Sequence, residues 1–117
     1  MKELEELFSL LEEGTSPYQV VSHTEDYLKK AGFFGLSFGE PWDLALGEKY
    51  YVNHHGSTIF AFTMPERAER MGDIRIAAAH TDFPCLRIKP NPDVKNASYA
   101  GVNVEVYGGA ILNTWLD

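Results

Sequence analysis

The chain has 117 residues, 44% of them hydrophobic, and a formal net charge of −7 at pH 7. This length fits one small domain, and the apolar content excludes a disordered or low-complexity chain. The acidic balance argues against nucleic acid or an anionic membrane surface as the main partner, and no apolar run approaches the roughly 20 residues of a membrane span.

Cysteine content and the N-terminal composition bear on the compartment. Cys85 is the only cysteine, which excludes an internal disulfide and is typical of a reducing compartment. Residues 1–13 hold five glutamates and lack the unbroken apolar stretch of a secretory signal. We therefore expect a soluble, cytoplasmic protein.

The first predicted helix lies before Gly14, which is expected to end it. Its apolar side chains recur at the i, i+3, i+4 and i+7 spacing of one helical face. These residues are Leu4, Leu7, Phe8 and Leu11.

A second helix is predicted from Ser16 to about Ala31. Ser16 can accept a hydrogen bond from the backbone N–H of Gln19, and the Gln19 side chain can bond back as a capping box. Pro17 suits the first helical position, and Gly32 is expected to end the helix in the left-handed conformation.

Beyond this helix the apolar period changes from helical to alternating. Residues 49–53 and 58–63 predict two strands of a hairpin, joined by residues 54–57. Residues 74–79 form a small apolar run with one arginine, which is typical of a central strand covered on both faces.

Residues 86–89 and 102–107 alternate cleanly and predict two further strands, with the Pro-Asn-Pro run at 90–92 expected to break the chain between them. Open strand edges template pairing with another chain, so we expect self-association; the competing outcome is a monomer in which the residues past about Lys89 stay disordered. Two N-terminal helices followed by strands predict an α/β fold with a mixed β-sheet.

The strand predicted at 74–79 would deliver His80 and then Asp82, before Pro84 ends it. Positions i and i+2 of a strand share one face, so both side chains can converge at the strand end, where open α/β sheets place their sites. A histidine that binds metal usually donates its other N–H to a carboxylate or carbonyl. The pair therefore fits a zinc ligand and its orienting acid, although His-x-Asp alone is more often a satisfied polar pair.

Residues 80–89 closely resemble the His-Thr-Asp-Ser-Pro-Cys-Leu segment of the aspartyl aminopeptidases. Three more stretches resemble family motifs in the same order, and this collinearity is more specific than any one match. They are residues 15–18, 56–62, and 104–110 with 114–117. The sequence departs at Phe83, where the family usually has Ser, and at Ala110, where it usually has a third Gly.

The resemblance implies a dinuclear zinc exopeptidase that removes an N-terminal residue, usually Asp or Glu, from a peptide. In family members the histidine matching His80 binds one of the two zinc ions, and the aspartate matching Asp82 lies beside it and supports catalysis. The other ligands and the general base are expected beyond Asp117. Residues 1–85 then match the start of the catalytic domain, and residues 86–117 the start of an inserted β domain used for subunit assembly.

A catalytic zinc ion needs three protein ligands and a water position, so the isolated chain is expected to be inactive. The complete protein is expected to be a homo-oligomer. The rival interpretation is a non-catalytic assembly or binding module derived from the same family. A third is a relative in the same metallopeptidase superfamily with another N-terminal preference.

Other residues of ligand type have plainer interpretations. His54 and His55 are adjacent, so on a strand they would point to opposite faces, and one ion could take both only in a tight turn; we expect an exposed hairpin tip. His23 is expected to form a solvated pair with Asp26, one helical turn away. Cys85 has no companion cysteine and is expected to be a buried, inert thiol.

Overall fold

The computed structural model describes residues 2–72, 74–109 and 111–115. The chain divides into two compact units, Met1–Thr81 and Asp82–Asp117. The first unit contains two helices and a three-stranded sheet, and the second contains a two-stranded antiparallel hairpin. The predicted α/β layout of two helices followed by a mixed sheet is confirmed.

Both N-terminal helices form where the sequence predicts them. Helix α1 spans Lys2–Glu13 and helix α2 spans Pro17–Lys30. Ser16 is the N-cap of α2 and accepts from the Gln19 backbone N–H at 3.4 Å. Gln19 bonds back through its side-chain oxygen, which accepts from the Ser16 hydroxyl at 2.5 Å. Past the helix end, Gly32 adopts a φ of +82°, as expected of a left-handed stop.

The sheet of the first unit has the order β1-β2-β3. Strand β1 (Phe34–Leu36) pairs parallel with β2 (Lys49–His54), and β2 pairs antiparallel with β3 (Thr58–Thr63). The predicted hairpin of β2 and β3 is confirmed, with β2 one residue longer than expected. The short strand β1 was not predicted from the sequence.

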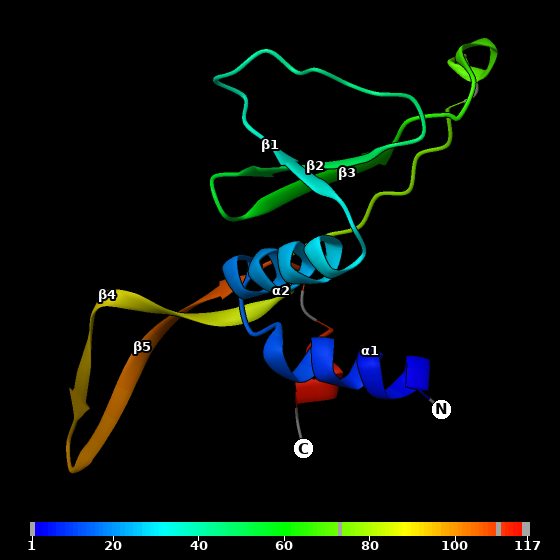
Figure 1. Ribbon diagram of the computed structural model, residues 1–117. Coiled ribbons are helices and arrows are strands. Elements are labelled where there is room, and N and C mark those ends of the chain that lie inside the picture. The colour runs from blue at the N-terminus through cyan, green and yellow to red at the C-terminus, as the bar shows by residue number, and fades with distance from the viewer. Residues whose placement is uncertain (1, 73, 110, 116–117) are drawn as a thin grey trace. The chain divides into compact units, whose positions relative to one another are not determined.

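The buried residues of the first unit lie on α2 and on both faces of β2, since Tyr51 bonds to Glu25 of α2 while Tyr50 bonds to the β1–β2 loop at Ala45. Helix α2 lies against the sheet, in contact with β2 and β3 (Figure 1). Val21 of α2 and Val52 of β2 are 0% and 1% exposed, and Tyr50 and Tyr51 are also buried. A single strand and a single helix thus supply the buried residues of this unit.

An aromatic cluster extends this core along the loop between β1 and β2. Trp42 stacks on Phe62 of β3 with ring centroids 6.2 Å apart, and its indole N–H donates to the Ser37 carbonyl at 2.8 Å. The Tyr50 hydroxyl accepts from the Ala45 backbone N–H at 2.9 Å. These contacts hold the loop that a parallel strand pair requires, because its strands cannot be joined by a tight turn.

The second unit is built on the antiparallel hairpin of β4 (Cys85–Asn96) and β5 (Tyr99–Tyr107). The predicted break at residues 90–92 is wrong, since β4 runs through them. The register shifts there instead: Ile88 pairs with Val104 and Asp93 pairs with Val102. Residues 89–92 therefore oppose Asn103 alone, and such a bulge accommodates prolines that cannot donate to a ladder. A 3-10 helix, Leu112–Trp115, follows.

The strand predicted at residues 74–79 is also wrong. The segment follows the 3-10 helix Ala68–Arg70 and has no regular secondary structure. Ile74 is 76% exposed and Ile76 is 84% exposed. A strand needs a hydrogen-bonded neighbour, and among the described residues none pairs with this segment.

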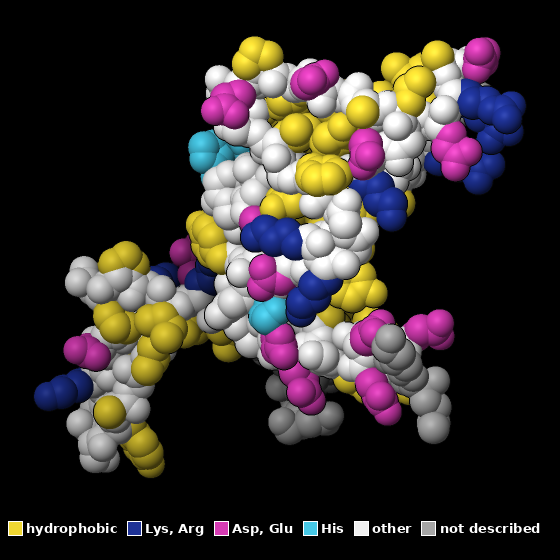
Figure 2. All heavy atoms as spheres, in the orientation of Figure 1, with side chains coloured by type: hydrophobic (Ala, Val, Ile, Leu, Met, Phe, Trp, Pro, Cys, Tyr) yellow, Lys and Arg dark blue, Asp and Glu magenta, His cyan; other side chains and the backbone are white. Residues whose placement is uncertain are grey.

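Surface composition differs between α1 and the β4–β5 hairpin. Acidic side chains gather over α1, and apolar side chains gather over the hairpin (Figure 2). The apolar stripe of α1 is itself largely exposed, with Phe8 at 54% and Leu11 at 64%. Within the part of the chain that the structure describes, no helix combines the length and apolar character needed to cross a lipid bilayer.

Candidate functional site

His80 ends the segment of residues 74–80, which has no regular secondary structure, and its side chain is exposed. The next residue anchors this segment to the sheet, because the Thr81 hydroxyl donates to the Ser57 carbonyl in the β2–β3 turn at 2.9 Å. His80 therefore follows a segment without regular structure and directly precedes Thr81, whose hydrogen bond attaches the chain to the β2–β3 turn.

Asp82 begins the second unit and is half-buried. The Tyr107 hydroxyl donates to Asp82 Oδ2 at 2.8 Å, a length typical of a strong hydrogen bond to a carboxylate. The Arg87 guanidinium lies over the Tyr107 ring, 4.3 Å from its centroid, which is the geometry of a cation–π contact. Neither Tyr107 nor Arg87 was singled out from the sequence.

The backbone holds Tyr107 and Asp82 in place at the open end of the hairpin. Tyr107 is the last residue of β5 and pairs with Cys85, the first residue of β4. Gly108 adopts a φ of +79°, and a Cβ there would lie 3.3 Å from Pro84 Cα. A side chain at Gly108 would thus be strained by its backbone conformation and crowded by Pro84.

The carboxylate of Asp82 raises the pKa of the Tyr107 phenol, first through the hydrogen bond and then through its negative charge. Both effects disfavour the phenolate. Tyr107 is consequently a protonated donor to Asp82 throughout the neutral pH range.

The described residues do not complete a zinc site. Among residues 2–72, 74–109 and 111–115 there is no group of three or more His, Cys, Asp and Glu side chains that could hold a metal ion. A catalytic zinc ion takes three protein ligands. The described residues therefore do not supply a full set of zinc ligands by themselves.

The remaining histidines and the cysteine have other surroundings. His54 and His55 are exposed at the hairpin tip, as expected, but the turn brings their ring centroids to 4.1 Å. The Nδ1 atom of His23 lies 2.9 Å from a carboxylate oxygen of Glu13 on α1, so its ion-pair partner is Glu13 and not the expected Asp26. Cys85 is a free thiol and is half-buried, not buried as predicted.

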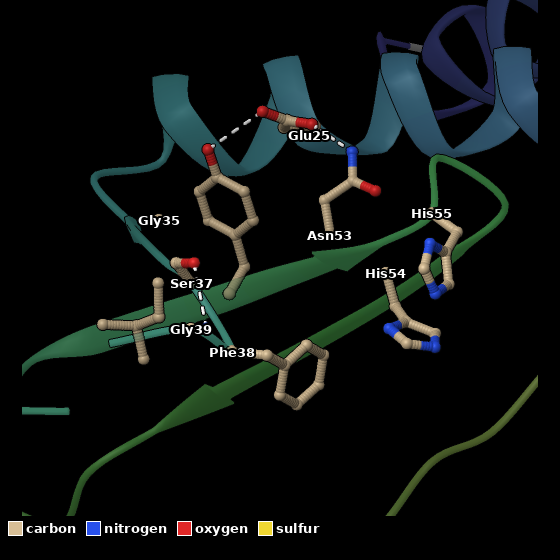
Figure 3. Close-up of a pocket in the computed structure, with 10 residues that line it drawn as sticks. Glu25, Gly35, Ser37, Phe38, Gly39, Asn53, His54 and His55 are labelled. Atoms are coloured by element: carbon tan, nitrogen blue, oxygen red, sulfur yellow. Dashed lines mark hydrogen bonds between the residues drawn. The ribbon is translucent and has the colours of Figure 1, made fainter. Parts of the chain in front are cut away.

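A groove of about 640 Å³ lies in the first unit beside β1 and β2 (Figure 3). Its lining combines a carboxylate, two imidazoles and two aromatic rings with two glycines. These residues are Glu25, Gly35, Leu36, Ser37, Phe38, Gly39, Tyr51, Asn53, His54 and His55.

Glu25 makes three structural contacts at the edge of this groove. It accepts from Asn53 Nδ2 at 2.7 Å and from the Tyr51 hydroxyl at 3.2 Å, and Lys29 Nζ lies 2.8 Å from Oε1. The contact with Lys29, followed by that with Asn53, lowers the pKa of Glu25. A carboxylate held ionised by these partners is suited to joining α2 to β2 and poorly suited to taking up a proton.

Comparison with known proteins places these observations in a family. The family model for aminopeptidase I zinc metalloproteases (M18) matches residues 10–117. The chain belongs to the M18 family. The match includes both units, and with them His80 and Asp82.

Bacterial M18 relatives are similar over almost all of the chain. A Streptomyces avermitilis protein named "Probable M18 family aminopeptidase 2" is 41% identical over 113 residues, which is 97% of this chain and 26% of the relative. An Ectopseudomonas mendocina protein of the same name is 39% identical over 111 residues, which is 95% of this chain and 26% of the relative. The chain thus spans about a quarter of the length of these M18 relatives.

Solved structures carry the same fold. A chain in the cryo-EM structure of the Ape4 and Nbr1 complex has a TM-score of 0.82 and 32% identity, over 93% of this chain and 21% of that chain. Aminopeptidase I from Borrelia burgdorferi B31 has a TM-score of 0.72 and 20% identity, over 98% of this chain and 30% of that chain. The resemblance inferred from the motifs is therefore confirmed at the level of the M18 family.

Proposed function

We propose that this chain is the N-terminal part of a zinc metalloaminopeptidase that removes acidic N-terminal residues from peptides. The observation that carries the proposal is the M18 match over residues 10–117, which includes the His80-Thr81-Asp82 motif. Within it, residues 1–85 are assigned to the catalytic domain and residues 86–117 to the start of a β domain for subunit assembly.

His80 is proposed as a zinc ligand and Asp82 as the carboxylate that supports catalysis beside it. The exposure of the His80 side chain is compatible with an imidazole that other ligands approach. Asp82 is already held by a donor, as carboxylates around metal centres usually are. Two zinc ions per active site require further ligands, because His80 is one ligand and the described residues hold no metal-binding group of three.

The chain alone is proposed to be inactive for the same reason. One histidine does not supply the three protein ligands of a catalytic zinc ion. An assay of aspartyl, glutamyl and leucyl anilides with the 117-residue chain and added zinc should show no turnover that a chelator abolishes. Chelator-sensitive turnover by the chain itself would refute this part of the proposal.

The complete protein is proposed to act as a cytoplasmic homo-oligomer, with neither nucleic acid nor a membrane as partner. The hairpin supports association, since several of its large apolar side chains are exposed: Leu86, Ile88, Val94, Tyr99, Val102 and Val106. Exposed apolar surface of this kind marks interaction sites. Light scattering of the chain should give a mass that rises with concentration; a constant monomer mass would contradict association through these residues.

The activity itself is tested with the complete protein encoded by the gene that contains this chain. We expect chelator-sensitive release of N-terminal Asp and Glu from short peptides, with slower release of Leu. His80→Ala should abolish the activity, while His55→Ala, at the exposed hairpin tip, should leave it unchanged. Absence of peptidase activity from the zinc-loaded native protein would favour the alternative, a non-catalytic assembly or binding module of M18 descent.

A further inference from the structure

The geometry of the second unit points to a further residue of the site, and we propose that Tyr107 is a positioning residue that fixes the carboxylate of Asp82. The role rests on the proposed function, which places Asp82 in the active site. Arg87 supports Tyr107 by lying over the face of its ring. Neither Tyr107 nor Arg87 needs to touch the substrate for this role.

The hydrogen bond between Tyr107 and Asp82 is short, and neither of its two residues is fully exposed. The Tyr107 hydroxyl donates to Asp82 Oδ2 at 2.8 Å, and both residues are half-buried. Partial burial strengthens such a hydrogen bond, because less water competes for the carboxylate. A donor held at one carboxylate oxygen restricts rotation of the carboxylate about its terminal torsion. The distribution of that torsion is otherwise broad.

The hairpin register explains why Tyr107 reaches Asp82. Pairing of Tyr107 with Cys85 sets β5 beside the point where the chain leaves Asp82. The turn at Gly108, with its φ of +79°, passes against Pro84. The backbone on both sides of the hydrogen bond is thereby constrained, so the contact does not depend on the two side chains alone.

Arg87 adds a restraint on the ring. Its guanidinium carbon lies 4.3 Å from the Tyr107 centroid, close enough for an attractive cation–π contact. Arg87 and Tyr107 lie on neighbouring strands of the same ladder, where diagonal side chains are within reach of each other. The ring is therefore held on its face by Arg87 while its hydroxyl is directed at Asp82.

The chemistry favours a permanent donor at this position. A phenol that keeps its proton can donate its hydroxyl hydrogen to a carboxylate oxygen. The raised pKa of Tyr107 agrees with this division of roles. An oriented carboxylate is suited to accept the second N–H of a metal-bound histidine.

The role is tested in the complete, zinc-loaded protein with Tyr107→Phe, which removes only the hydroxyl. Tyr99→Phe is the matched control, because Tyr99 begins the same strand and is 79% exposed. We expect Tyr107→Phe to lower kcat about 10-fold with little change in KM and to weaken zinc retention against a chelator, at the low end of the 10–100-fold typical of groups behind metal ligands. Tyr99→Phe should leave both unchanged.

A double variant separates positioning from a general structural effect. In the Asp82→Asn background, adding Tyr107→Phe should cause little further loss, since the two side chains act as one unit. An independent loss of full size in that background would overturn the proposal. So would a Tyr107→Phe protein with native kcat and zinc retention.

The contact is also tested without activity, in the 117-residue chain. The Tyr107 ring carbon signal, assigned by its absence in Tyr107→Phe, is followed by NMR during a titration. We expect Asp82→Asn to lower the midpoint, because the carboxylate that opposes the phenolate is gone; an unchanged midpoint overturns the contact. A native protein without peptidase activity would overturn the proposed function and the catalytic role with it, whereas an active native protein with an unaffected Tyr107→Phe variant would overturn the role alone.

Discussion

The two units of this chain are stabilised in different ways. Every residue found buried, Val21, Tyr50, Tyr51 and Val52, belongs to the first unit. Among the described residues of β4 and β5 none is buried. The first unit therefore gains stability from packing α2 on the sheet, while the hairpin relies on its ladder, and a two-stranded hairpin alone is at best marginally stable in water.

This difference has a consequence for function. In the second unit, Asp82 and Tyr107 are half-buried and are joined by a hydrogen bond at the open end of the hairpin. The proposed site residue Asp82 is thus fixed by a local polar contact in a unit without a large core. Substitutions at the buried residues of the first unit should act mainly on stability, and substitutions at His80 and around Asp82 mainly on the site.

The largest expected stability effect is that of Val52→Ala. Val52 is 1% exposed, so the change removes buried methyl groups and leaves a cavity, at a cost of roughly 2–3 kcal/mol. Val102→Ala is the matched change in the hairpin, where Val102 is 60% exposed, and should alter the free energy of unfolding by less than about 0.5 kcal/mol. Urea denaturation of both variants measures the difference in the free energy of unfolding; equal losses would contradict the conclusion that buried packing stabilises the first unit and not the hairpin.

Gly35→Ala should have the next largest effect. A Cβ at Gly35 would lie 2.9 Å from the Tyr51 hydroxyl oxygen and 3.1 Å from Cζ. Tyr51 is buried and donates to Glu25, so its shift should cost roughly 1–2 kcal/mol in the free energy of unfolding. Gly39→Ala, whose nearest atom is Ser37 Oγ at 3.7 Å, should be nearly neutral in the same denaturation experiment. A Gly35→Ala chain as stable as Gly39→Ala would show that Tyr51 is not tightly placed.

Glu25→Gln should have a smaller effect, of roughly 1 kcal/mol in the free energy of unfolding, since one charged acceptor is replaced by an amide. The pH dependence of the stability of this variant is more informative than the size of the loss. The folded-state pKa of Glu25 lies below its ordinary value of 4.5, so its stabilisation is present above about pH 4.5 and is lost as pH falls through the folded-state pKa. Thermal melts should therefore show a weaker decline with acid in Glu25→Gln than in Glu40→Gln, an exposed control. Identical acid profiles would contradict the lowered pKa.

Much of the first unit could be predicted because its signals are local. The Ser16 cap, Pro17 and Gly32 mark the ends of α2 within a few residues of each other, and the alternation in β2 and β3 is visible within each strand. The parallel strand β1 is only three residues long, and its pairing with β2 spans a long loop. No periodicity can be recognised in so short a segment.

The wrong predictions share a physical cause, which is dependence on partners distant in sequence. Residues 74–79 have the composition of a buried strand, but composition does not supply hydrogen-bonding neighbours. The prolines at 90 and 92 do disturb the ladder, but a bulge absorbs them without ending β4. Both outcomes depend on pairing and not on the residues of the segment.

The residues of the candidate site also differ in whether the local sequence could reveal them. His80 and Asp82 could be proposed from a contiguous motif and its resemblance to a family. The contact of Tyr107 with Asp82 could not, because it depends on the β4–β5 register and joins residues 25 positions apart in the chain. The sequence marked Tyr107 only as the end of a predicted strand and as part of the family-like stretch at residues 104–110.

The zinc content of the complete protein is the most direct test of whether His80 binds metal. We expect two zinc ions per subunit in the native protein by elemental mass spectrometry after removal of free metal. His80→Ala should lose at least one of them, while His55→Ala should retain both. A native protein without zinc, or a His80→Ala protein with the native zinc content, would contradict the assignment of His80 as a ligand of an M18 aminopeptidase.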